Sequence, residues 1–379
     1  INMAGDSKPT RTPMTATARR TSRFSSRSNT RSYNIEPSPV VLEIGSTVIR
    51  VGYAEQFQPQ HLIRMEHPNF DVEANKRGSN SKTKTESEWY LALAPVMEQV
   101  YDRLMCKPST RRVVCLYKPY APAAFQKAIQ QHLWNREVPA LVELDILQVV
   151  PMAQGWKRGL VVHISREEAI CVCHADGYNI PYTYQMVPAG YKTMLDSSID
   201  TFTGKTSYRL PTNEDYDDLD RKIDQVMLNV HDPNSLVFAI LMCLQECPRD
   251  LRSHVVSNIV FCGDGFALLP DLPRKVAKKV EQVLQEGLES AEPSTGVTRT
   301  SGTDVPPATE PVFSMIPLDM ASLRPLASRL TLASCAPHRA DWISWVGASL
   351  WAAAWNKYDE DETPIPWTFS KKVEEPSND

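Results

Sequence analysis

The pattern of apolar and polar positions predicts strands and helices along most of the chain. The run VVLEIGSTVIRVGYA at 40–54 predicts a strand, a turn at Gly45-Ser46 and a second strand. Apolar residues then recur with helical spacing, which predicts an amphipathic helix. Its apolar positions are Trp89, Leu93, Val96, Met97, Val100 and Leu104.

The same patterns continue to the C-terminal part of the chain. Further strands are predicted at 111–117, after Val138-Pro139, at 159–180 as a hairpin, at 258–264 and at 329–335. Further helices are predicted at 123–134, 218–230, 235–247, 276–288 and 341–356. Strands that alternate with helices, with hairpins among them, indicate a layered α/β protein with mixed sheets.

Two segments lack these patterns. Residues 1–34 are rich in Ser, Thr and Arg and carry seven basic residues against Asp6, a balance of +6. With few large apolar residues, this segment cannot bury enough surface to fold, so we predict a disordered basic tail. It has no apolar run typical of a secretory signal, although its composition also resembles a transit peptide. Residues 286–311, rich in Pro, Ser, Thr and Gly, predict a flexible insertion.

Composition and charge exclude several classes of protein. The chain is 42% hydrophobic and 23% charged, which is typical of a globular protein. Its net charge is −4, so the part beyond the basic tail carries −10, which argues against a nucleic-acid-binding body. No apolar run reaches the roughly 18 residues of a membrane span. The eight cysteines lack paired spacing, which favours buried free thiols in a reducing compartment.

Four stretches, in this order, resemble the actin family. They are EIGSTVIRVGYA (43–54), GLVVHISREEAICVCHADGYNI (159–180), CPRDLRSHVVSNIVFCGDGFALLPDL (247–272) and WVGASLWA (345–352). The resemblance implies the two-lobed fold of actin and Hsp70-type ATPases. Residues 35–150 with 336–379 would then form the small lobe, and 151–335 the large lobe.

The resemblance also implies a vestigial nucleotide site. Its candidate residues are Gly45, Ser46, Arg50, Gly263 and Gly265. In this family two hairpins present backbone N–H groups to the phosphates. Here Glu43 stands in place of the usual Asp. Thr47 replaces a glycine, and Arg50 replaces the phosphate-contacting lysine.

The second hairpin lacks the residues that catalysis needs. The family has Asp-x-Gly-Asp-Gly where this chain has His163-Ile164-Ser165-Arg166-Glu167, so both carboxylates and both glycines of that motif are missing. Ile146 falls where a glutamine would position the attacking water. We therefore predict no catalytic residue, no metal ligand, no cofactor and no enzymatic activity. Binding of ATP or ADP without turnover remains open.

The lengths of two regions indicate a particular role within the family. The regions that would form subdomains 2 and 4, the pointed end of an actin subunit, are shorter than in actin. With CPRDLR (247–252) and KPSTRRVV (107–114), the chain is most similar to the pointed-end subunit of dynactin. This implies a cytoplasmic, cytoskeletal protein that binds the actin-like filament of the first actin-related protein and other pointed-end subunits, without nucleic acid or direct membrane contact. The alternatives are a nuclear actin-related subunit of a chromatin remodeller and an active ATPase of the superfamily.

Overall fold

The computed structural model describes residues 37–45, 48–65, 84–194, 213–287, 318–335, 338–355 and 367–369. All of them belong to one compact unit, Pro37–Asp379. The predicted basic tail at 1–34 and most of the predicted insertion at 286–311 lie outside the described residues.

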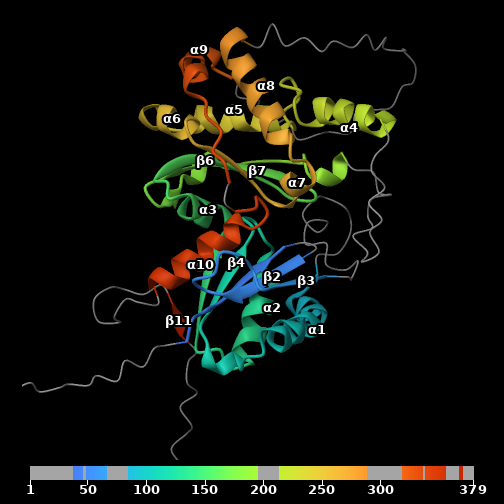
Figure 1. Ribbon diagram of the computed structural model, residues 1–379, viewed down its shortest axis with the longest axis vertical. Helices are drawn as coiled ribbons and strands as arrows, with labels where there is room; N and C mark the ends of the chain where they lie inside the picture. The colour runs from blue at the N-terminus through green and yellow to red at the C-terminus, as the bar shows by residue number, and fades with distance from the viewer. Residues whose placement is uncertain are drawn as a thin grey trace, which may run out of the picture. The chain divides into compact units, whose positions relative to one another are not determined.

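A six-stranded mixed sheet contains the first hairpin of the chain (Figure 1). Its order is β11-β5-β4-β1-β2-β3. The parallel strands β1, β4 and β5 form its centre, and β2, β3 and β11 add antiparallel pairs at its two sides. The strands are β1 (Val40–Ile44), β2 (Val48–Tyr53), β3 (His61–Arg64), β4 (Val113–Tyr117), β5 (Ala140–Asp145) and β11 (Thr368–Phe369).

Both faces of this sheet are buried at its centre, which is why β1 and β4 are nearly continuous apolar runs. Val40 and Leu42 face a core shared with α1 (Glu86–Leu104) and α2 (Ala123–Trp134), whereas Val41 faces a second core. The predicted helix that starts near Trp89 is confirmed as α1, and all six of its predicted apolar positions are buried. A capping box between Thr85 and Glu88 fixes its beginning.

A second mixed sheet has the order β10-β6-β7-β8, with β9 paired to β7. β6 and β7 form the predicted hairpin, and β10 lies parallel to β6. The strands are β6 (Arg158–Ile164), β7 (Ala169–Ala175), β8 (Tyr178–Asn179), β9 (Gln185–Val187) and β10 (Ile259–Cys262).

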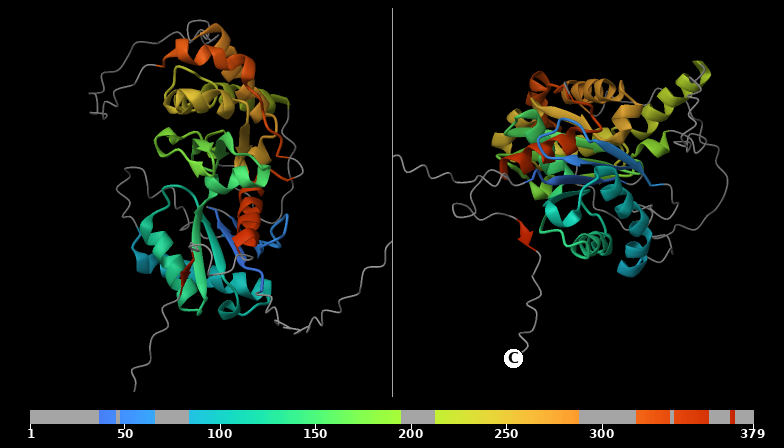
Figure 2. Two further views of the ribbon diagram at one scale, coloured as in Figure 1. Left: turned by 90° about the vertical axis from the view of Figure 1, so that its left-hand side faces the viewer. Right: turned by 60° about the horizontal axis from the view of Figure 1, so that its bottom comes forward.

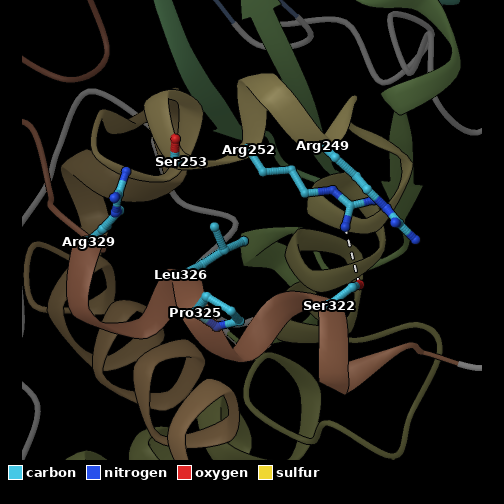
Figure 3. A pocket seen from close by; sticks show the side chains of 7 residues that line it. All are labelled: Arg249, Arg252, Ser253, Ser322, Pro325, Leu326 and Arg329. Carbon is cyan, nitrogen blue, oxygen red and sulfur yellow. Dashed lines mark hydrogen bonds between the residues drawn. The ribbon is translucent and has the colours of Figure 1, made fainter.

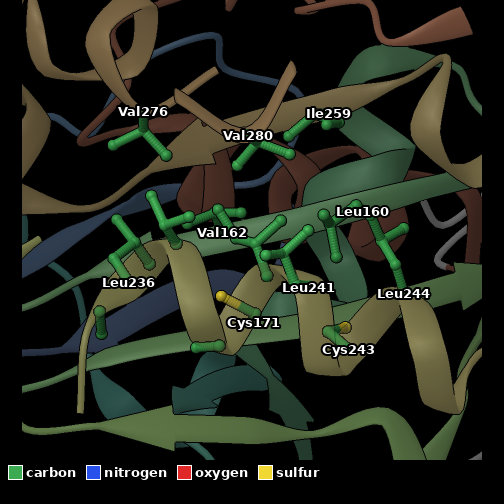
Figure 4. Packing of buried hydrophobic residues seen from close by; sticks show 14 of the residues in the cluster. Leu160, Val162, Cys171, Leu236, Leu241, Cys243, Leu244, Ile259, Val276 and Val280 are labelled. Atoms are coloured by element: carbon green, nitrogen blue, oxygen red, sulfur yellow. The ribbon is translucent and has the colours of Figure 1, made fainter. Parts of the chain in front are cut away.

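Helices α5 (Leu236–Glu246) and α8 (Leu272–Glu286) share a core with one face of the second sheet. Figure 4 shows α5 against the sheet, with Leu241 beside Leu160 in the same apolar layer, and α5 packs on β7. The Sγ atoms of Cys173 and Cys243 are 3.5 Å apart within this core. The free thiols here are packing residues, as the sequence predicts.

Helices α3 (Ile146–Gln154) and α10 (Ile343–Trp355) belong to a third core, which contains residues of both sheets. Val41 and Val114 come from the first sheet, and Val161 and Val260 from the second. The two helices pack directly on each other (α10 is red in Figure 2). Gly347 permits this contact, because a Cβ there would collide with the Val149 carbonyl oxygen.

The predicted mixed α/β architecture is confirmed, but one predicted strand is wrong. Residues 324–329 form the 3-10 helix η6 (Arg324–Arg329), and the segment after it makes a single bridge, between Leu332 and Ile259. Helix α3 and strand β3 were not predicted. The remaining described elements are η2 (Pro108–Thr110), η3 (Pro181–Thr183), η4 (Tyr191–Thr193), α4 (Asn213–Val226), α6 (Arg249–Val256), α7 (Asp264–Leu268) and α9 (Met320–Leu323). None of the described helices combines the length and apolar character needed to cross a membrane.

Candidate functional site

A buried cluster of charges surrounds Arg50, one of the predicted site residues. Arg50 lies on β2 with 5% of its surface exposed, directly across from Glu43 on β1. Its Nη1 donates to Glu43 Oε1 at 2.7 Å. Its Nη2 pairs with Asp264 and lies 3.9 Å from Asp341 Oδ2. One guanidinium therefore contacts carboxylates from three separate parts of the chain; we call these four residues the Arg50 cluster.

The turn after β10 positions Asp264 by close backbone packing. Gly263 has a φ of 99°, a conformation that favours glycine, and a Cβ there would collide with the Ile164 carbonyl oxygen. A Cβ on Gly265 would collide with the side chain of Ile164. The Gly263 N–H donates to Ala340 O at 3.1 Å. The glycines therefore let the turn pass close to β6 and direct Asp264 toward Arg50.

The segment that leads into α10 completes the cluster. Asp341 accepts two hydrogen bonds from Arg339, at 3.0 and 2.9 Å. Ser344 donates its hydroxyl to Glu43 Oε2 at 2.8 Å. The cluster thus links the first hairpin, the turn after β10 and the start of α10, which belong to different sheets and helices.

The electrostatics of the cluster favour the ion pairs. Burial opposes the charge on Arg50, but Asp264 and Glu43 together raise the pKa of the guanidinium above its ordinary value. Burial by itself would raise the pKa of the Asp264 carboxyl. Arg50 outweighs this effect and lowers the pKa, with smaller contributions from Lys118 and His163. For Glu43 burial prevails, and its pKa is raised in spite of Arg50 and Ser344.

This arrangement opposes phosphate binding. Glu43, Asp264 and Asp341 already compensate the charge of Arg50, while Arg339 pairs with Asp341 and Lys118 acts on Asp264. A phosphate would have to displace these carboxylates from Arg50. The geometry suits a structural link between chain segments better than an anion site.

The backbone donors of the first hairpin are engaged as well. The Gly45 N–H donates to Val48 O at 3.0 Å and closes the turn. Gly45 and Gly263 each use their N–H groups within the protein, so neither presents it to a ligand. The structure brings Arg50, Gly263 and Gly265 together through Asp264, whereas Ser46 and Thr47 lie outside the described residues.

The second hairpin is closed by its own hydrogen bonds. The N–H and the hydroxyl of Ser165 both donate to Glu168 O, at 2.9 and 3.0 Å. The Glu167 carboxylate accepts a hydrogen bond from Lys192 at 2.8 Å. Ile146 is buried at the start of α3. Among the described residues, no three His, Cys, Asp or Glu side chains gather in a way that could hold a metal ion.

Sequence reasoning missed three members or supports of the Arg50 cluster: Asp264, Asp341 and Ser344. Asp264 had one visible signal, because it is a charged residue between two glycines directly after the buried strand β10. For Asp341, the nearby Arg339 was the one feature of the sequence that suggested an ion pair. Nothing in the sequence suggested a role for Ser344.

The chain was compared with known proteins. No protein-family model matches it, and no curated protein matches it in sequence. A functional assignment therefore depends on the residues and their arrangement.

Proposed function

We propose that this protein is a non-catalytic actin-related subunit of dynactin, similar to the tenth actin-related protein. It caps the pointed end of the actin-like filament formed by the first actin-related protein. It also anchors pointed-end partners in dynein-based transport. The observation that carries the proposal is the Arg50 cluster. Arg50 stands where the family has its phosphate-contacting lysine, and here its guanidinium is bound by carboxylates of the protein itself.

The cluster gives this protein a means of holding its first hairpin in place without a nucleotide. In an actin-type ATPase the phosphates and their metal lie between the hairpins and fix them. Here Arg50 bonds from the first hairpin to Asp264, on the turn after β10, and approaches Asp341 before α10, so ion pairs fix that hairpin instead. A subunit held in this way does not depend on turnover, which suits a permanent position at the end of a filament.

The lengths of the predicted subdomains support capping. Head-to-tail assembly is an open heterologous contact and stops where a subunit lacks the next face. A chain with short counterparts of subdomains 2 and 4 would dock through its barbed face and offer no complete surface to a further subunit. The two mixed sheets, with α3 and α10 in the core that contains residues of both, are compatible with such a fold.

Affinity purification of the tagged full chain from cytoplasmic and nuclear fractions, followed by mass spectrometry, tests the proposal. We expect dynactin subunits in stoichiometric amounts in the cytoplasmic fraction. Recovery of a chromatin-remodelling ATPase from the nuclear fraction, without dynactin, would overturn the proposal in favour of a nuclear actin-related subunit. The absence of catalysis has its own test, which is phosphate release from ATP by the purified chain. Release above the buffer background would contradict it.

A further inference from the structure

A pocket with a basic lining lies away from the Arg50 cluster, between α6 and the segment formed by α9 and η6 (Figure 3). Its volume is about 510 Å³, within the range of small-molecule sites. Three of its seven lining residues are arginines, and none is acidic. The lining consists of Arg249, Arg252, Ser253, Ser322, Pro325, Leu326 and Arg329.

Arg252 is a fixed part of this pocket. It is nine-tenths buried, and its Nε donates to Cys247 O at 2.8 Å. Nη1 donates to Ser322 Oγ at 3.1 Å, and Nη2 donates to Gln245 O at 2.5 Å. Each terminal nitrogen carries two N–H groups, so one on each remains for a further acceptor. The guanidinium is held in place before any ligand arrives.

The charge of Arg252 is not matched within the described part of the chain. All three of its acceptors are neutral, being two carbonyl oxygens and one hydroxyl. Arginine is rarely buried without a counter-charge, because a buried ion that lacks one is costly. The exposed Arg249 and Arg329 add two positive charges, and in the same described ranges neither forms an ion pair. An anion is the ligand that would compensate this charge.

We propose that this pocket binds a phosphate monoester, with Arg252 as its fixed donor and Arg249 and Arg329 as charged groups at its sides. A dianionic phosphate accepts several hydrogen bonds, and guanidinium groups match its geometry in a bidentate manner. Ser253 supplies a hydroxyl donor to a further oxygen, whereas the Ser322 hydroxyl donates to Asp319 O at 2.9 Å and holds Arg252 in place. The volume also accommodates the side chain or small molecule that bears the phosphate. This inference does not depend on the proposed function.

The site is tested by calorimetric titration of the full chain with three probes. These are inorganic phosphate, a capped Gly-phosphoserine-Gly peptide and the unphosphorylated peptide. We expect saturable one-to-one binding of at least one phosphorylated probe and none of the unphosphorylated peptide. Tighter binding of the peptide would identify a phosphorylated protein segment as the source of the ligand. Equal or tighter binding of inorganic phosphate would identify a free phosphate compound.

Variants locate the site. The double variant Arg249→Gln with Arg329→Gln changes exposed side chains and should weaken binding at least tenfold. Arg252→Gln should abolish binding. If the Arg252→Gln variant does not fold, the double variant by itself shows whether the pocket is the binding site. Arg274→Gln, an exposed arginine of α8 outside the lining, is the matched control and should bind as the wild type does. Absence of phosphate binding by the wild type would overturn the proposal. So would unchanged binding by the double variant, which would place the anion elsewhere, for example on the basic residues of 1–34.

Discussion

Arg50 and Arg252 are both buried arginines, yet their surroundings give them opposite properties. Arg50 meets three carboxylates within 4 Å, and its charge is more than compensated. Arg252 meets two carbonyl oxygens and a hydroxyl, and its charge is not. The actin-like resemblance places an anion site at Arg50, but the charges favour one at Arg252. The counter-charge therefore decides whether a buried arginine is available to a ligand.

The largest effect is expected from Arg50→Met. Removing the guanidinium leaves Glu43 and Asp264 without their main counter-charge, so the free energy of unfolding should fall by about 3–5 kcal/mol. Urea denaturation measures this directly. The matched control is Arg158→Met, which breaks an exposed pair with Asp176 at 3.2 Å and should cost less than about 1 kcal/mol. Equal losses in the two variants would show that the Arg50 cluster does not hold the fold together.

A smaller loss is expected from Arg252→Met. This variant leaves two carbonyl oxygens without a donor, but it also removes a buried charge that lacks a counter-charge. The free energy of unfolding should therefore fall by only about 1–3 kcal/mol. The same denaturation experiment checks it. A loss larger than that of Arg50→Met would mean that Arg252 is held by a counter-charge and is not available to a ligand.

The two carboxylates nearest Arg50 should respond to pH with opposite signs. Because the pKa of Asp264 is lowered on folding, its stabilising effect is present above its ordinary value near 3.8 and is lost as the pH falls through the lower folded value. Asp264→Asn should thus cost about 1 kcal/mol at pH 7 and progressively less in acid. Because the pKa of Glu43 is raised, wild type should gain stability relative to Glu43→Gln as the pH falls through that raised value.

Denaturation of the wild type and both variants between pH 2 and pH 7 measures these slopes. Parallel slopes for the two variants would contradict the assigned pKa directions. Arg252 has no carboxylate partner in the described ranges, so Arg252→Met should show no comparable pH dependence.

The smallest effect is the stabilisation of the folded chain by phosphate. At a phosphate concentration equal to the dissociation constant, binding to the pocket should add about 0.4 kcal/mol to the free energy of unfolding. Arg50→Met should keep this increment, and the Arg249→Gln, Arg329→Gln double variant should lose it. Denaturation curves of each variant with and without phosphate, at constant ionic strength, measure the increment. If only Arg50→Met lost it, the phosphate would bind at the Arg50 cluster and not at the pocket.

The spacing of apolar residues predicted a helix or a strand well where it matched only one of the two. The helix 123–134 has the predicted bounds, and the first hairpin turns at Gly45 as predicted. The predicted strand at 329–335 failed because alternating apolar residues such as Leu330 and Leu332 do not by themselves supply a pairing partner. Only Leu332 bridges to β10. Helix α3 was missed because its short apolar run continues directly from β5.

The candidate site could be predicted only in part. Arg50 and the turn glycines were visible from the resemblance, but the partners of Arg50 were not. Asp264 lies 214 positions along the chain, and nothing local indicates that the two side chains meet. The neutral surroundings of Arg252 were equally invisible, because they depend on Ser322 from a distant segment and on backbone carbonyls. Counter-charges are a tertiary property, and a single sequence does not display them.

We propose that this protein caps a filament without using a nucleotide. The most direct test follows the growth of single filaments of the first actin-related protein at each end, in the presence of substoichiometric purified full chain stripped of nucleotide. We expect growth to stop at the pointed end and to continue at the barbed end, and Arg50→Met to lose this activity together with its stability. Continued growth at both ends, or capping only after ATP is added to the stripped protein, would contradict it.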